Sequence, residues 1–254
     1  MKMLRYIVVA ILAFVATDAW AWTAEVKKAV LMFAEENLSN KAKREINSLL
    51  GAPLSSIEFV KGGKNKSRLD ESGKSVTNSS TDAVVRLEKA IATLQNKRAS
   101  TAERKSALCE VAELTVDIHC LANVLIDRHL EKNFTFSSHN SMQKEFIYYA
   151  VKKNSWQEMW HKEFHKAHGV FSAEMYLYDW KIATKGMAKH YHKEAVAPRK
   201  WVEKTGERAF EALKVFQPGV LVESVEVPKI EEVNNACLYD AAFHLANLLN
   251  ETLK

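Results

Sequence analysis

The chain has 254 residues, of which 36 are lysine or arginine and 31 are aspartate or glutamate, so its formal net charge is +5 at pH 7. This mild excess permits an anionic partner without demanding one, and the length suits one large domain with a real core. Three cysteines exclude a framework of several disulfides. Cys109 and Cys120 on one helix are too far apart to bond, which leaves either a bridge to Cys237 or three free thiols.

Residues 1–21 have the pattern of a secretory signal peptide. Lys2 and Arg5 precede the apolar run YIVVAILAFVA, and Ala19-Trp20-Ala21 forms a small-x-small cleavage site. The alternative is a membrane anchor, but the run is too short to span a bilayer comfortably. We therefore expect a secreted or periplasmic protein that begins at Trp22, has a formal charge of +4 and makes no stable membrane association after cleavage. Glycosylation sequons occur at Asn37, Asn65, Asn78, Asn133 and Asn250, and matter only if the source glycosylates exported proteins.

The rest of the chain has a helical period almost throughout. Apolar residues recur at spacings of three and four in 24–38, 80–95, 109–123 and 233–253, and no run alternates as a strand would. With only 8 glycines and 4 prolines, the sequence predicts an all-α fold, formed as one domain over 22–254. The exception is 61–80 (KGGKNKSRLDESGKSVTNSS), which we predict to be a long, mobile polar loop.

The stretch 109–123 (CEVAELTVDIHCLAN) is apolar nearly all round, as in a helix buried on most faces. Upstream, Ser100 and Glu103 match a capping box that would start this helix. Glu113 and Asp117 are four residues apart and so project from one face of it. Two carboxylates on a buried surface are costly unless a cation meets them, so the sequence predicts a cation at this position.

His161, His165 and His168 repeat at spacings of four and three, which places them on one stripe of a helix. Imidazoles at this spacing can chelate zinc or copper. The stripe lacks the glutamate directly after the first histidine that the HExxH proteases have. A solvated face interleaved with lysines is the alternative interpretation.

Three segments, in order, resemble the zinc-dependent single-strand nucleases of the S1/P1 type. The mature start, 22–51, is similar to the family's opening, which runs from an N-terminal Trp to a Leu-Leu-Gly. The segment 98–123 resembles the family's Gly-Asp-Ile-His-Gln-Pro-Leu-His region, and 239–251 resembles its closing Arg-Leu-Ala-x-x-Leu-Asn helix. The resemblance implies a mostly helical fold of the phospholipase C/P1 nuclease type that holds three zinc ions. In that family zinc-bound water attacks a phosphodiester or a 3'-phosphate.

Carried over residue by residue, the resemblance leaves an eroded zinc site. Trp22, whose freed amine and carbonyl would bind metal, and Asp117 match family ligands, whereas Lys27, Glu113 and Asn123 stand where the family has histidines. The later segment 154–161 supplies Gln157 and His161, or Trp156 and Trp160, at the second-zinc positions. The resemblance therefore implies fewer zinc ions than the family's three, or none.

This comparison offers a cation for the helix carboxylates. We predict that the ammonium of Lys27, together with the new amine of Trp22, supplies the positive charge that zinc supplies in the relatives. The alternative is that Lys27 points to solvent and Glu113 pairs with an arginine elsewhere.

Three functions follow from these patterns. The first is a catalytically impaired or inactive nuclease-like protein that acts in binding, with single-stranded nucleic acid or nucleotides as candidate partners. The second is an active phosphodiesterase or 3'-nucleotidase with a reduced metal site on Trp22, Glu113 and Asp117, where Lys27 would also take part. The third is a metal-binding protein that uses the His161, His165 and His168 stripe.

Overall fold

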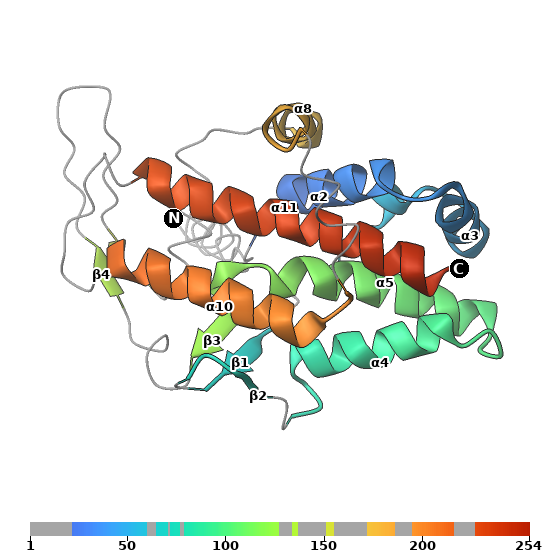
Figure 1. The fold of residues 1–254 in the computed structure, drawn as a ribbon, viewed down its shortest axis with the longest axis horizontal. Coiled ribbons are helices and arrows are strands. Elements are labelled where there is room, and N and C mark those ends of the chain that lie inside the picture. Colours follow the sequence, from blue (N-terminus) through green and yellow to red (C-terminus); the bar gives the residue numbers. More distant parts are fainter. Residues whose placement is uncertain are drawn as a thin grey trace, which may run out of the picture.

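The computed structural model describes residues 22–59, 65–70, 72–76, 79–126, 134–136, 151–154, 172–185, 195–215 and 227–254. The signal peptide predicted over 1–21 and the histidine stripe at His161, His165 and His168 lie outside these ranges. Within them the protein is mostly helical, and the helices form one body (Figure 1). The helices are α2 (Ala24–Glu36), α3 (Asn40–Leu50), α4 (Ala83–Gln95), α5 (Thr101–Ile118), α8 (Ala173–Ala183), α10 (Pro198–Val215) and α11 (Val227–Thr252).

The starts of α2, α3, α4, α5 and α8 follow from their capping residues. Thr23, Ser39, Asp82 and Ser172 each accept a hydrogen bond from a backbone N–H in the first turn of the helix that follows. The capping box predicted at Ser100 and Glu103 is confirmed at the start of α5.

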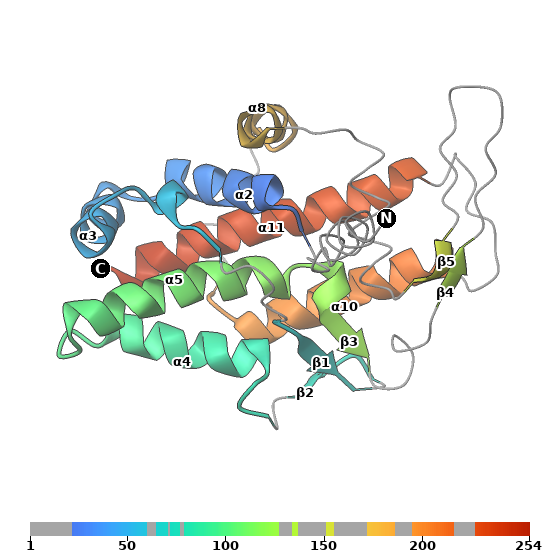
Figure 2. The ribbon, with the colours of Figure 1, turned by 180° about the vertical axis from the view of Figure 1, so that it is seen from behind.

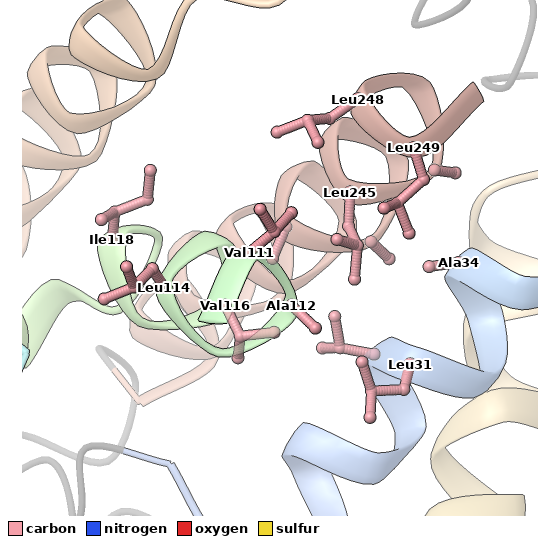
Figure 3. Close-up of a cluster of buried hydrophobic side chains, with 14 of the residues drawn as sticks. Leu31, Ala34, Val111, Ala112, Leu114, Val116, Ile118, Leu245, Leu248 and Leu249 are labelled. Carbon is pink, nitrogen blue, oxygen red and sulfur yellow. The ribbon is translucent and has the colours of Figure 1, made fainter. Parts of the chain in front are cut away.

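The core lies where α5, α11 and α2 meet. Figure 3 shows Leu31 and Ala34 of α2 facing side chains of α5 and α11. Residues 241–249 of α11 are all buried, as expected for a helix that is apolar nearly all round. The prediction that 109–123 is buried on most of its faces is also confirmed in its helical part, because the residues from Val111 to Ile118 are buried except Glu113. In both ribbon views α4 lies beside α5 and α8 lies outside α2 (Figures 1 and 2).

The all-α prediction is confirmed in its coarse form, a mostly helical body, but the described residues also form two small sheets. β1 (Ser67–Leu69) pairs antiparallel with β2 (Ser75–Val76) and parallel with β3 (Val124–Ile126). A second pair joins β4 (Phe134–Phe136) to β5 (Val151–Asn154). Strands of two to four residues are too short to show an alternating pattern, so periodicity did not indicate them.

The prediction of one long polar loop over 61–80 was wrong for the described residues that form β1 and β2. Ser67 and Leu69 of β1 are buried, and the turn between β1 and β2 is closed by Asp70, which accepts hydrogen bonds from the backbone of Ser72 and Lys74. The short 3₁₀ helices η2 (Leu54–Ser56) and η3 (Leu121–Asn123) complete the described elements.

A close approach between α10 and β1 depends on Gly206. A Cβ added there would lie 2.0 Å from Cδ1 of the fully buried Leu69. We expect Gly206→Ala to lower the free energy of unfolding by about 1 to 2 kcal/mol, because overpacking outweighs the gain in helix propensity. Denaturant unfolding measures the change, with the exposed neighbour Glu207→Ala as control. Adding Leu69→Ala should relieve the clash, so additive losses in the double variant would contradict the explanation.

Two further sequence questions are answered by the described residues. Cys109, Cys120 and Cys237 are all free, so no disulfide joins them. None of the described helices is long and apolar enough to cross a bilayer.

Candidate functional site

The buried carboxylate of Asp117 meets the ammonium of Lys27. Lys27 lies in the first turn of α2, Asp117 lies in the last turn of α5, and the Nζ of Lys27 donates to Oδ1 of Asp117 at 2.7 Å. The two residues are 4% and 1% exposed. The predicted contact is therefore confirmed between Lys27 and Asp117, and the alternative that Lys27 points to solvent was wrong. The part assigned to the Trp22 amine stays a prediction. The Nζ of Lys27 also lies 5.1 Å from the ring centroid of Phe59.

Asn65 joins both carboxylates of the α5 face. Its Nδ2 donates to Oδ2 of Asp117 at 2.7 Å and to Oε1 of Glu113 at 3.2 Å. Its Oδ1 accepts a hydrogen bond of 2.6 Å from Nη1 of Arg86, so the orientation of the amide is determined by its partners. Asn65 is only 5% exposed, and its amide nitrogen is engaged, so the sequon at this position is not accessible in the folded protein.

Arg86 in the first turn of α4 completes the network. Its Nε and Nη2 both donate to Oε1 of Glu110 on α5, at 3.1 and 2.8 Å. Arg86 therefore makes its ion pair with Glu110, and the alternative that an arginine pairs with Glu113 has no support among the hydrogen bonds of Arg86. Hydrogen bonds run without a break from Lys27 through Asp117 and Asn65 to Arg86 and Glu110, and they tie α2, α5 and α4 together.

Burial dominates the ionisation of the two central carboxyl groups. It raises the pKa of Glu113, and the nearby charge of Asp117 raises it further, while Lys27 and Asn65 act in the opposite direction. Burial also raises the pKa of Asp117, against the lowering effects of Lys27 and Asn65. Removal of the Lys27 ammonium would thus leave the buried negative charge of Asp117 without a positive charge in direct contact.

The described residues do not fit the zinc site that the nuclease resemblance implies. Structural and catalytic zinc sites use three or four thiolate, imidazole or carboxylate ligands. Here both carboxylate oxygens of Asp117 accept short hydrogen bonds from nitrogen donors. One of these donors is the Lys27 ammonium, which takes the place that a metal ion would need. No group of three or more His, Cys, Asp or Glu side chains suited to a metal ion occurs in the part of the chain that the structure describes.

Trp22 and Asn123, which the resemblance to the nuclease family places at zinc-ligand positions, make hydrogen bonds within the protein. The indole Nε1 of the buried Trp22 donates to Oδ1 of Asn234 on α11 at 3.3 Å. Asn123 donates from Nδ2 to the backbone oxygen of Asp117 at 3.2 Å, where it stands in place of a family histidine. Among the described contacts, none joins the indole of Trp22 to Glu113 or Asp117.

A second polar cluster, which the sequence did not indicate, contains two buried histidines. Nδ1 of His119 lies 2.6 Å from the carbonyl oxygen of Thr115, and its Nε2 lies 2.8 Å from Nδ1 of His244 on α11. A carbonyl only accepts, so His119 carries its proton on Nδ1 and His244 donates to Nε2 of His119. The ring of Trp201 stacks on His244 with centroids 4.4 Å apart and an interplanar angle of 7°.

Both histidines are held neutral by their surroundings. Burial lowers the pKa of His119 to about 3, helped by His244, and burial lowers the pKa of His244 to about 4. Asp240 raises both values but is itself paired with Lys204 and Arg208 at 3.0 and 2.8 Å. In the sequence, His244 is one of two polar residues within the otherwise apolar run 241–249, which does not single it out.

The geometry defines a mostly helical protein with two buried polar clusters, one centred on Lys27 and Asp117 and one on His119 and His244. Comparison with known proteins adds no family to this description: no protein-family model matches the sequence, and no curated protein is similar to it.

Proposed function

We propose that this chain is an exported binding protein with a fold of the P1 nuclease type, in which a protein cation takes the place of zinc. The observation that carries the proposal is the 2.7 Å contact between Lys27 Nζ and Asp117 Oδ1, at the positions that correspond to a zinc ligand pair in the resembling family. Single-stranded nucleic acid or nucleotides are the candidate partners, and the mild positive charge of the chain is compatible with them.

The burial of the cluster favours binding over hydrolysis. A general base or a metal ligand that acts on substrate needs a route to the reacting atoms. Asp117 is 1% exposed and both of its oxygens are engaged by Lys27 and Asn65. Such a carboxylate stabilises the packing of α2 against α5 and does not contact a substrate.

The first test combines metal content with activity. We expect the mature protein, purified with zinc and beginning at Trp22, to contain no stoichiometric zinc by mass spectrometry and to hydrolyse neither single-stranded DNA nor 3'-AMP. Dialysis against EDTA should leave the Tm unchanged, because a chelator does not remove the Lys27 ammonium.

Two variants separate the alternatives if zinc does bind. Zinc lost in Asp117→Asn but kept in His165→Ala, together with turnover, would replace the proposal with a reduced-site phosphodiesterase. The reverse pattern, without turnover, would replace it with a metal-binding protein that uses the histidine stripe.

A further inference from the structure

A groove of about 500 Å³ lies between α4 and α5, next to the buried network. Its volume falls within the range of small-molecule sites. Arg86 and Glu110 belong to both features, because they line the groove and also end the chain of hydrogen bonds from Lys27. One end of the groove is therefore formed by the Arg86–Glu110 ion pair, which connects α4 to α5.

The two walls of the groove carry opposite charges. α4 contributes Arg86 and Lys89, and α5 contributes Glu103 and Glu110. The pair Arg86 and Glu110 is already formed across the groove through Oε1 of Glu110. The Lys89 ammonium has no hydrogen bond or ion pair with any residue in the described ranges, and it remains exposed.

The remaining surface supplies apolar contact and one more polar group. Val85, Ala90 and Ala107 line the groove between the charged walls. The hydroxyl of Ser106, on the α5 wall, has no partner among the described residues. Ser80 and Thr93 also line the groove, so polar and charged groups surround a small apolar floor, as suits a polar ligand with a short apolar part.

We propose that this groove binds a small zwitterion, an amino acid or a short peptide with free termini. The ligand carboxylate would contact the ammonium of Lys89 and the hydroxyl of Ser106, and the ligand ammonium would contact Oε2 of Glu110. Apolar side chains would pack on Val85, Ala90 and Ala107. A phosphate group fits less well, because Glu103 and Glu110 line the same groove and repel a dianion. The inference goes beyond the proposed function, because it assigns a different ligand class to a groove that lies outside the Lys27 and Asp117 contact.

Titration calorimetry with trialanine tests the proposal on the mature protein. We expect trialanine to bind, and N-acetyl-trialanine amide, which lacks both charges, to bind at least tenfold more weakly. Lys89→Gln should weaken trialanine binding about tenfold. Lys105→Gln removes an exposed lysine of α5 that does not line the groove, and should leave binding unchanged.

Several results would overturn the assignment. Absence of trialanine binding, equal binding of the capped peptide, or no effect of Lys89→Gln would each do so. Tighter binding of AMP than of trialanine would assign the groove to nucleotides instead. Zinc content and hydrolysis are measured separately, so a metal-free, inactive protein that fails to bind trialanine would leave the proposed function standing while this inference fails.

Discussion

Replacing Lys27 with methionine is expected to lower the free energy of unfolding by about 3 to 5 kcal/mol at pH 7. Methionine keeps the length of the side chain but removes the ammonium that lies 2.7 Å from Asp117 Oδ1. Asp117 would then remain buried with Asn65 as its one described side-chain donor. Denaturant unfolding followed by circular dichroism measures the loss.

The adjacent Lys28→Met is the matched control, because Lys28 is exposed on the same helix. Similar losses in the two variants would contradict the role of Lys27. The double variant Lys27→Met/Asp117→Asn removes both charges and should recover much of the stability, since an unpaired buried charge costs more than a neutral pair.

The loss in Lys27→Met should also depend on pH. Without the ammonium, burial raises the pKa of Asp117 further, so the folded protein takes up a proton at higher pH than the unfolded chain. The difference in stability between Lys27→Met and wild type should therefore be smallest at acidic pH, where the carboxyl group of Asp117 is neutral. A loss that stays constant between pH 7 and 4 would show that the destabilisation comes from packing rather than from charge.

The second large effect is a loss of stability in acid, which we expect from protonation of the His119–His244 pair. The folded pKa values of about 3 and about 4 lie below the ordinary value of 6.5, so the unfolded state binds more protons between these limits. The stabilisation is fully present above pH 6.5 and is lost as the pH falls toward 4 and then 3. At pH 5 each histidine should contribute a loss of about 2 kcal/mol relative to pH 7.

Unfolding of wild type and of His119→Asn/His244→Gln between pH 7 and pH 5 isolates this contribution from that of the carboxyl groups. The double variant should be less stable at pH 7, because the hydrogen bond between the rings and the stacking on Trp201 are lost. Its stability should nevertheless fall less steeply with acid. The same slope in both proteins would rule out these histidines as the source of acid sensitivity.

Part of the Lys27 cluster was predictable because its main signals are local. Glu113 and Asp117 share a face by helix spacing alone, and their apolar surroundings show that the face is buried. The choice of Lys27 as the cation came from the resemblance to the nuclease family, and the geometry of the contact confirms it while the role of the cluster remains a proposal. The remaining members, Asn65 and Arg86, gave no such signal.

The sequence by itself determined the helical period of four segments, the capping box that starts α5 and the buried face of that helix, because periodicity and capping act over a few residues. Only the tertiary structure decided which distant groups meet. Asn65 comes from the polar segment before β1, and it reaches Asp117 because β1 pairs with β3, directly after the α5 region. His119 and His244 are 125 positions apart, and their hydrogen bond exists because α11 packs against α5. Contacts of this kind depend on how amphipathic elements pack, and many packings satisfy the same local pattern.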